Sequence, residues 1–478
     1  MNDQIRRLAA VVAVMFLALF VSVTSVQFFQ APDLNADGRN VRTVYREFGR
    51  DRGPIVVAGT PVATSTPVDD VYGFQRSYDP GAPYAHVTGY FSTVFNSITG
   101  LELAANDVLN GTSSSLLLER IQSLFTGDQP QGGAVELTLD PAAQEAAIAG
   151  LGDREGAVVA LDPATGAILA MVSTPSFDPN ALATRSRTDA EEAFAELSAD
   201  PAQPLVNRAI AGDQYAPGSS FKVITAAAML EAGATPETMV EAPTELELPQ
   251  STAVLRNPGQ RACGDGSGEV TLMAAFRQSC NTPFALAAMD LGEEELRAQA
   301  EAFGFGAELA VPLEVTPSRY PETASQAELA MSGIGEASVR VTPLQMAMVA
   351  AAVANDGIQM QPYLVARELT ADLEVASTTE PTDLRESVSA GTAEALTQMM
   401  VEVVADGTGG PAQIPGVEVA GKTGTAENAE GVDPHAWFIG FAPAQDPQVA
   451  VAVVVENGGD GGTNAGPIAR EVMQAVLR

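Results

Sequence analysis

Residues 157–172 read AVVALDPATGAILAMV, and this stretch decides the class of fold. Two apolar runs, 157–161 and 168–172, lie on either side of the segment Asp162-Pro163-Ala164-Thr165-Gly166. Proline and glycine in such a connecting segment suit a tight turn between two strands. The stretch therefore predicts a β-hairpin.

The hairpin is the first part of a longer pattern. From about residue 205 to 360 the chain shows helical periodicity, and apolar strand-like runs return at 436–441 and 448–455. Residues 467–477 then read as an amphipathic closing helix. Strands near both ends with helices between them predict an α+β fold, in which one antiparallel sheet is assembled from both ends of the domain with helices around it.

The composition of the 478 residues is acidic and unusually poor in lysine. Lysine occurs only twice among 25 basic residues, and the net charge is -35 at pH 7. Nucleic-acid affinity depends largely on basic residues that displace counterions from phosphates, so this charge excludes nucleic acid as a main partner. We interpret the acidity as a solvated surface.

Residues 8–29 contain no charged side chain and are mostly apolar, which is long enough, as a helix, to cross a bilayer core of about 30 Å. Arg6 and Arg7 precede this stretch, which predicts that residues 1–7 are cytoplasmic and the rest extracytoplasmic. A cleaved signal peptide is the competing interpretation. The stretch exceeds the roughly 7–15 apolar residues of such a signal, and no clear Ala-x-Ala site follows. We expect an uncleaved single-pass anchor in the cell membrane.

Two further regions follow the anchor. Residues 30–132 mix short strand-like runs, such as 53–57, with clusters of turn-forming residues, which predicts a small, irregular module. The low-complexity segment Gly127–Gly133 marks a boundary. Residues 133–478, which contain the hairpin, the helices and the later strands, are predicted to form the main domain.

Both lysines lie in short motifs that suit catalysis. Lys222 ends the segment Pro217-Gly218-Ser219-Ser220-Phe221-Lys222, and Lys422 begins Lys422-Thr423-Gly424-Thr425. Arginine stays protonated in proteins, whereas burial or a second cation can remove the proton from a lysine amine. We therefore interpret the two lysines as sites of amine chemistry, with chance survival under codon bias as the alternative.

The first motif predicts a nucleophile beside a base. Pro217-Gly218 before an apolar helical run places Ser219 at or near a helix N-terminus. Lys222 follows at i+3 on the same helix face, so its amine, when neutral, can accept the serine proton. Further along, Ser279-Cys280-Asn281 supplies a hydroxyl that can relay a proton and an amide that can orient a lysine and a substrate carbonyl. Each motif alone is a weak signal, but three in this order are not a chance match.

The three motifs resemble those of the penicillin-binding proteins, the acyl-serine transferases of bacterial wall synthesis. Asn40–Arg42 with Arg52–Ile55 is similar to the start of the pedestal in monofunctional class B members, and Thr342–Ala347 is similar to their helix beyond the second motif. The layout resembles the actinobacterial, division-associated PbpA type. The resemblance implies a pedestal or dimerisation-like domain at 30–132. It also implies that 133–478 form a transpeptidase domain of the penicillin-binding, serine β-lactamase-like fold.

Carried over residue by residue, the resemblance implies that Ser219 is the nucleophile and Lys222 its base. Ser279 and Asn281 would be the proton relay and the orienting amide. The backbone N–H groups of Ser219 and Thr425 would form the oxyanion hole. Whether Lys222 alone takes the serine proton stays open in this class.

The third motif is implied to bind the substrate. Lys422, Thr423, Gly424 and Thr425 would hold the terminal carboxylate of a D-alanyl-D-alanine stem peptide. Lys422, which also counts as catalytic, would help to keep Lys222 neutral by repulsion between like charges. The implied function is a peptidoglycan D,D-transpeptidase that cross-links stem peptides through an acyl-serine and is an antibiotic target, inhibited by penicillins.

Two positions depart from the family pattern. Cys280 occupies the variable middle position of the second motif. Gly335-Glu336-Ala337 stands before the helix at Thr342, where relatives often have Gly-Gln-Gly. Both departures leave the catalytic motifs themselves intact.

The expected partners are peptidoglycan stem peptides, β-lactam antibiotics, the plasma membrane and membrane proteins of wall synthesis or cell division. No cofactor is implied. His86 and His435, with Cys263 and Cys280, do not show the spacing of zinc ligands, so no metal site is predicted. An exported compartment permits the two cysteines to form a disulfide, which is our hypothesis, with two separate buried thiols as the alternative.

Four alternative functions compete with transpeptidation. A secreted β-lactamase of the same superfamily needs neither a retained anchor nor an extra domain of about 100 residues, well beyond an ordinary linker. A D,D-carboxypeptidase differs only in using water instead of an acceptor amine. A penicillin sensor would need a cytoplasmic signalling part, whereas a division scaffold that uses the fold for binding remains compatible with catalysis.

Overall fold

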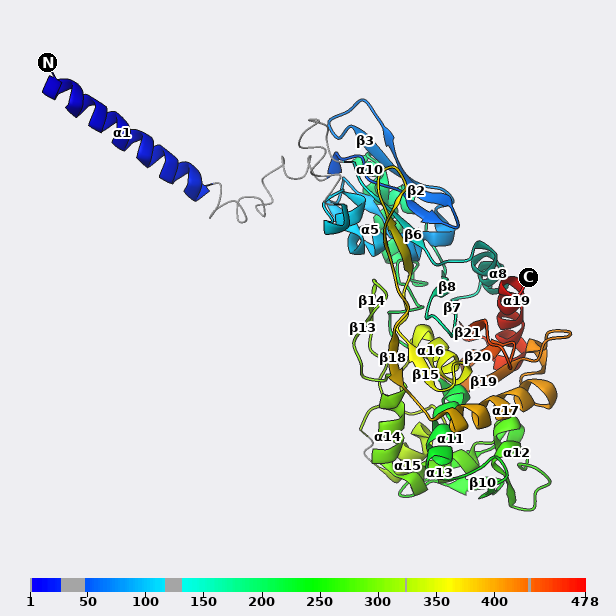
Figure 1. Cartoon of the computed structure of the whole chain (residues 1–478). Coiled ribbons are helices and arrows are strands. Elements are labelled where there is room, and N and C mark those ends of the chain that lie inside the picture. The colour runs from blue at the N-terminus through cyan, green and yellow to red at the C-terminus, as the bar shows by residue number, and fades with distance from the viewer. Residues whose placement is uncertain (1, 27–47, 117–130, 323–324, 429–430) are drawn as a thin grey trace. The chain divides into compact units, whose positions relative to one another are not determined.

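The computed structural model describes residues 2–26, 48–116, 131–322, 325–428 and 431–478 of the chain (Figure 1). It divides into two compact units: Met1–Asp51 with Ser65–Gln75, and Arg52–Thr64 with Arg76–Arg478. Each unit is described by itself.

The first unit contains the N-terminal helix α1, Asn2–Thr24. Its apolar stretch Gln4–Thr24 is long enough to cross a membrane, as predicted for an anchor. The helix begins six residues before the predicted start at residue 8, because Asn2 to Arg7 continue the same helix. Residues 27–29 of the predicted span, and Asn40–Arg42 of the pedestal resemblance, lie outside the described residues.

The second unit is built on a five-stranded sheet with the order β19-β20-β21-β7-β8, in which every neighbouring pair is antiparallel. The predicted hairpin is confirmed as β7 and β8, and the two predicted later strands are confirmed as β20 and β21. The edge strand β19, which carries the third motif, was not predicted as a strand. The strands are β7 (Gly156–Leu161), β8 (Ile168–Thr174), β19 (Ala420–Ala426), β20 (His435–Ala442) and β21 (Val449–Val455).

Both faces of this sheet are covered by helices, because alternate residues of each strand are apolar on both sides. Val158 packs in the same cluster as α8 (Pro141–Leu151) and α19 (Gly466–Val476). Its neighbour Val159 packs in the cluster that contains α16 (Pro343–Ala354). The α+β class with helices around an antiparallel sheet is therefore confirmed.

Further helices lie beyond α16 and surround α11 (Lys222–Glu231), which contacts α13, α14 and α17 (Figure 1). These helices are α12 (Leu272–Arg277), α13 (Thr282–Leu291), α14 (Glu293–Ala302), α15 (Gln326–Ser332) and α17 (Ala390–Asp406). A capping side chain begins α12, α15 and α17, and a proline begins α13, whereas α14 begins after Gly292 with three glutamates in its first turn.

A second sheet joins strands from distant parts of the sequence. Its consecutive neighbours are β17-β16-β6-β1-β2, with β1 (Ile55–Val57) parallel to β6 (Ala134–Leu137) and β16 (Val365–Leu369) antiparallel to β6. β2 (Thr60–Pro67) lies between β1 and β3, and the edge strands are β17 (Val375–Thr378) and β3 (Phe74–Tyr78).

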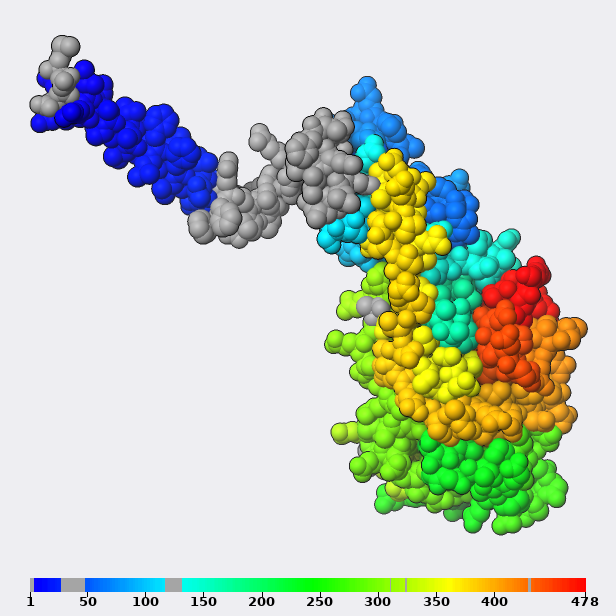
Figure 2. All heavy atoms as spheres, viewed as in Figure 1, coloured from blue at the N-terminus to red at the C-terminus, as the bar shows by residue number. Residues whose placement is uncertain are grey.

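Strands β16 and β17 form the far end of a long hairpin arm, residues 358–386. Its near end is the pair β15 (Ile358–Met360) and β18 (Asp383–Glu386), directly after α16. Figure 2 shows the arm as a yellow-to-gold band along this face of the molecule. The arm carries residues from the second half of the chain into the sheet of the pedestal region.

Glu102 forms a buried charge cluster in the pedestal region with two arginines. Its carboxylate accepts hydrogen bonds from Arg52 Nε at 2.5 Å and Arg76 Nε at 2.6 Å, and all three side chains are buried. Burial opposes ionisation of Glu102, but the two guanidinium groups outweigh it and hold its pKa below the ordinary value.

The remaining elements, of which all but α10 are short, complete the second unit. In the pedestal region they are η2 (Ala82–Tyr84), α4 (Ala85–Thr88), β4 (Phe91–Ser92), β5 (Ser97–Ile98), α5 (Gly100–Ala104), α6 (Asn106–Leu109) and η3 (Ser114–Leu116). Later in the chain they are α9 (Pro179–Ala183), α10 (Arg187–Ala199), β9 (Met239–Glu241), β10 (Glu245–Glu247), β11 (Val254–Arg256), η5 (Pro258–Gln260), β12 (Glu269–Thr271), β13 (Leu309–Ala310), β14 (Glu314–Val315), η6 (Gly410–Ala412) and α18 (Gly461–Asn464).

Candidate active site

The first motif forms a tight turn that leads into a buried helix. Residues Gly218–Phe221 are a single 3-10 turn, η4, and α11 begins at Lys222. Gly218 has φ +54°, a conformation that favours glycine. Ser219 is half-buried, whereas Lys222 is fully buried. Ser219 therefore lies at the start of a helical segment, as predicted.

The amine of Lys222 is directed at the second motif. It donates to the backbone oxygen of Ser279 at 2.7 Å and to Oδ1 of Asn281 at 2.7 Å. The Ser279 hydroxyl lies 3.5 Å away. The second motif therefore holds the lysine of the first in one position.

The amine of Lys422, on strand β19, contacts the same serine, Ser279. It donates to the Ser279 hydroxyl at 2.8 Å and to the backbone oxygen of Thr423 at 3.0 Å. The hydroxyl of Ser279 thus stands between the two lysines of the chain. The structure brings Lys222, Ser279, Asn281 and Lys422 together, although up to 200 residues separate them in the sequence.

Both amines lie where a positive charge is unfavourable. Burial lowers the pKa of Lys222 well below its ordinary value, and the positive charge of Lys422 lowers it further, while the carboxylate of Glu336 opposes this. Burial alone lowers the pKa of Lys422 to about 7. An amine that is partly neutral near pH 7 can accept a proton, which general-base catalysis requires.

The third motif lies on the edge strand β19 and places the remaining predicted residues beside the turn. A Cβ atom at Gly424 would lie 2.8 Å from the backbone oxygen of Pro217, so glycine allows the strand to approach η4 closely. Thr425 is exposed, whereas Thr423 is buried and its hydroxyl lies 2.6 Å from that of Thr408. Thr408 was not predicted from the sequence, because no motif includes it.

Asn257 and a disulfide both hold the second motif. The side-chain oxygen of Asn257 accepts hydrogen bonds from the backbone N–H groups of Asn281 at 2.8 Å and Thr282 at 3.0 Å. Cys280 forms a disulfide with Cys263, which confirms the hypothesis of a bridge. Asn257 was missed by sequence reasoning, because a single asparagine in a loop carries no recognisable signal.

The two histidines lie outside this constellation. His435 accepts a hydrogen bond from the backbone N–H of Asn457 at 3.1 Å and packs edge-on against Tyr215. His86 donates to the backbone oxygen of Pro204 at 2.8 Å and packs edge-on against Phe177. Both therefore have packing roles in this structure.

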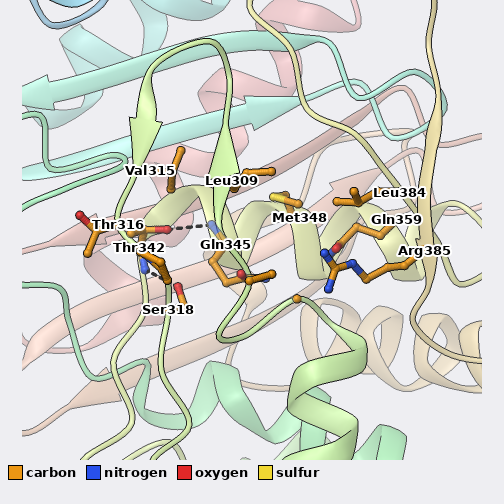
Figure 3. Close-up of a pocket in the computed structure, with 13 residues that line it drawn as sticks. Leu309, Val315, Thr316, Ser318, Thr342, Gln345, Met348, Gln359, Leu384 and Arg385 are labelled. Carbon is orange, nitrogen blue, oxygen red and sulfur yellow. Dashed lines mark hydrogen bonds between the residues drawn. The ribbon is translucent and has the colours of Figure 1, made fainter.

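Figure 3 shows a cavity at the N-terminal end of α16. At this end of the helix the Thr342 hydroxyl accepts a hydrogen bond from the backbone N–H of Gln345. Its volume of about 10 Å³ is close to that of a single water probe. None of the predicted site residues lines it. The cavity is therefore too small for a peptide substrate and is separate from the candidate active site.

A half-buried serine lies in the turn that leads into the helix of Lys222, and the amines of Lys222 and Lys422 converge on a second hydroxyl. This arrangement defines a serine acyl-transferase of the penicillin-recognising class. The family model of the penicillin-binding protein transpeptidase domain matches residues 156–474. The model of the penicillin-binding protein A dimerisation domain matches residues 52–135. The chain belongs to the penicillin-binding protein transpeptidase family, and within it to the actinobacterial PbpA type.

Relatives with known names and structures agree with this placement. The chain is 45% identical to the peptidoglycan D,D-transpeptidase PbpA of Mycolicibacterium smegmatis, over 100% of this chain and 99% of that one. It is 44% identical to PbpA of Mycobacterium tuberculosis, with the same coverage. The solved ceftriaxone acyl-enzyme complex of M. tuberculosis penicillin-binding protein A matches with a TM-score of 0.87 and 43% identity, over 91% of this chain and 100% of that one.

Proposed function

We propose that this protein is a peptidoglycan D,D-transpeptidase that joins stem peptides through an acyl-enzyme on Ser219 and is inhibited by penicillins. One observation carries the proposal, namely the convergence of the Lys222 and Lys422 amines on the Ser279 hydroxyl beside the turn that holds Ser219. The names of the relatives, and the penicillin G acyl-enzyme of the M. tuberculosis protein, support it.

In the first half-reaction, the Ser219 oxygen attacks the carbonyl carbon of the penultimate D-alanine while its proton passes to the neutral amine of Lys222. The backbone N–H groups of Ser219 and Thr425 stabilise the oxyanion that forms. The C–N bond then breaks, and the departing D-alanine nitrogen takes a proton that reaches it through the Ser279 hydroxyl. The products are an ester on Ser219 and free D-alanine.

In the second half-reaction, the amine of an acceptor stem peptide attacks the ester carbonyl. The proton lost by that amine goes to the same lysine and hydroxyl network, and the ester C–O bond breaks. Ser219 recovers its proton as it leaves, and a new amide joins the two stems. The amide of Asn281, already bound to Lys222 at 2.7 Å, orients this network.

Recognition of the donor falls to the third motif. The exposed Thr425 and the buried Lys422 and Thr423 would present hydroxyls and a cation to the terminal carboxylate of the donor. Within the described residues β19 is an edge strand, with which an extended substrate can pair, and Gly424 lets this strand lie close to the turn that carries Ser219. A penicillin, which carries a carboxylate beside its reactive amide, would occupy the same positions.

The assignment of Ser219 can be tested by intact-mass measurement of the full chain in detergent after exposure to penicillin G. We expect one adduct that peptide mapping places on Ser219, and none in Ser219→Ala. Ser220→Ala is the matched control, because Ser220 is the adjacent buried serine and its hydroxyl donates to the oxygen of Pro217 at 2.7 Å. An adduct elsewhere would overturn the site.

The same preparation separates the competing activities. A donor stem peptide with an added acceptor amine should give the cross-linked product. Release of D-alanine without cross-link would indicate a carboxypeptidase, and rapid turnover of penicillin would indicate a β-lactamase. Division function that survives Ser219→Ala in cells would favour a scaffold.

The arrangement at the membrane is also a proposal. The apolar helix α1 supports a membrane anchor, and Arg6 and Arg7 before its apolar centre favour a cytoplasmic N-terminus with the enzyme domain outside. Protease added to intact, wall-stripped cells should then digest the enzyme domain and spare an N-terminal tag. Protection of the domain would reverse the orientation.

The division into a pedestal at 30–132 and a transpeptidase domain at 133–478 is likewise proposed, with the pedestal as the contact for membrane proteins of wall synthesis and division. The family models, which match 52–135 and 156–474, support two parts. Deletion of the pedestal should abolish co-purification of such proteins, whereas Ser219→Ala should retain it.

A further inference from the structure

Glu336 lies in a loop that packs directly against the nucleophile turn. The preceding residue, Gly335, accepts the backbone N–H of Gly218 at 2.9 Å. A Cβ atom at Gly335 would lie 1.9 Å from the oxygen of Gly218, and the glycine has φ +81°. The loop and the turn therefore meet backbone to backbone, one residue away from Glu336 and one residue away from Ser219.

The carboxylate of Glu336 reaches the other wall of the same turn. Its Oε1 atom accepts the backbone N–H of Glu427 at 3.3 Å, just after the end of β19. A Cβ atom at Gly218 would lie 2.6 Å from the oxygen of Thr425, so the turn also packs against this end of β19. Glu336 thus connects the loop on one side of the turn to the strand on the other side.

Charged groups on three elements face this carboxylate. Burial raises the pKa of Glu336 to about 7. The hydrogen bond from the Glu427 N–H group opposes this rise, as do the charges of Arg340 and Lys222, whereas the negative charge of the Glu427 side chain adds to it. Arg340 belongs to the same loop and donates to the backbone oxygens of Ala337 and Val339. The influence is mutual, because the negative charge of Glu336 raises the pKa of Lys222 against burial and against Lys422.

We propose that Glu336 is a positioning residue for acylation, which ties the end of β19, the strand that carries Thr425, to the turn that carries Ser219. This inference rests on the proposed function, in which neutral Lys222 accepts the serine proton. Glu336 does not touch the reacting atoms; it acts through Lys222 and through the strand that carries the Thr425 N–H group.

The sign of the effect follows from the charges. Ionised Glu336 favours the protonated form of Lys222, so fewer molecules hold the neutral base at a given pH. Above about pH 7 the carboxylate is ionised and the restraint is present; in more acidic solution it is protonated and the restraint fades. Loss of the charge should therefore raise the acylation rate on the part of the rising limb that lies above about pH 7.

The test measures the second-order rate of acylation of the full chain in detergent by a fluorescent penicillin, from pH 5.5 to 9.5. Glu336→Gln removes the charge and keeps the acceptor oxygen. Its rising limb should move to lower pH by roughly half to one unit, equivalent to about three- to tenfold in rate at a fixed pH on the limb. Its plateau should stay within about twofold of the parent rate.

Glu336→Asp keeps the charge but shortens the reach to the Glu427 N–H group, so it should retain the parental limb and lower the plateau. Asp433→Asn, an exposed carboxylate on the β19–β20 connection, controls for net charge and should leave the profile unchanged. The inference would be overturned if the pH profiles of acylation for Glu336→Gln and the parent coincided. It would also be overturned if the rising limb moved in Glu336→Asp instead. Whatever the Glu336 variants show, loss of all acylation in Ser219→Ala would support Ser219 as the nucleophile, so the inference on Glu336 can fail while the proposed function holds.

Discussion

Ser279 is the residue on which the site converges. Its hydroxyl lies 2.8 Å from the Lys422 amine and 3.5 Å from the Lys222 amine, and its backbone adopts φ +56°, which is uncommon for a residue with a side chain. Such strain persists only where the surroundings hold it, and here the neighbouring disulfide and the Lys222 hydrogen bond do so. The two amines are also costly, because burial of a lysine disfavours its charged form.

For the two buried lysines we predict that the free energy of unfolding depends on pH through Lys422. Its pKa is about 7 in the folded chain and about 10.5 in the unfolded chain, so the unfolded state binds more protons between these values. The free energy of unfolding should therefore rise with pH from 7 to 10.5, by up to about 1.4 kcal/mol per unit, and be flat in this contribution below 7. Melting temperatures from pH 6.5 to 9.5 should rise less steeply in Lys422→Met.

Arg187→Met, on an exposed helix surface, is the control for loss of one cation and should keep the parental slope. Equal slopes for Lys422→Met and the parent would contradict a depressed lysine pKa. Lys422→Met should also lose acylation, because the Ser279 hydroxyl loses its donor.

At the scale of elements, the second motif depends on a loop that is linked to it covalently. The Cys263–Cys280 disulfide closes a loop over a sequence separation of 17 residues, and Asn257, just before that loop, binds the backbone at Asn281. Constraint of the unfolded chain by a loop of this length contributes roughly 3 kcal/mol to stability. The bridge therefore supports both the fold and the position of the motif.

The double variant Cys263→Ser with Cys280→Ser should be less stable by roughly 3 kcal/mol and should acylate more slowly, because Ser279 and Asn281 lose a restraint. Thermal unfolding and the rate with a fluorescent penicillin measure the two effects. A reductant should reproduce them in the parent and do nothing further to the double variant. An unchanged melting temperature would show that the bridge is dispensable.

At the scale of the whole molecule, the hairpin arm 358–386 makes the pedestal sheet depend on the second half of the chain. Strand β16 pairs with β6, which in turn pairs with β1. The buried cluster of Glu102 with Arg52 and Arg76 lies in the same region. A substitution in this cluster is expected to lower the free energy of unfolding and to leave the acylation rate of the folded protein unchanged, because none of its residues contacts the active-site motifs.

Glu102→Gln removes the negative charge that two buried guanidinium groups share, and should cost about 3–5 kcal/mol. Glu191→Gln is the control, because its ion pair with Arg187 is exposed and should contribute less than about 1 kcal/mol. Thermal unfolding compares the two. At a temperature where both are folded, the acylation rates should agree; equal stability of the two variants would argue against a structural role for Glu102.

Much of the molecule followed from short-range patterns. The hairpin at 157–172 and the closing helix at 467–477 were predicted because turn chemistry and periodicity depend on neighbours along the chain. The α+β class followed from the same signals.

The amino-acid sequence alone determined which side chains are candidates for the chemistry, since lysine occurs at only two positions and both lie in motifs. Tertiary structure alone decided their surroundings. Thr408, Asn257 and Glu336 join the site, and the arm joins the pedestal sheet, through contacts between residues tens to hundreds of positions apart. Local propensity holds no information about such contacts, because they form only when the packing of helices against the sheet brings distant segments together.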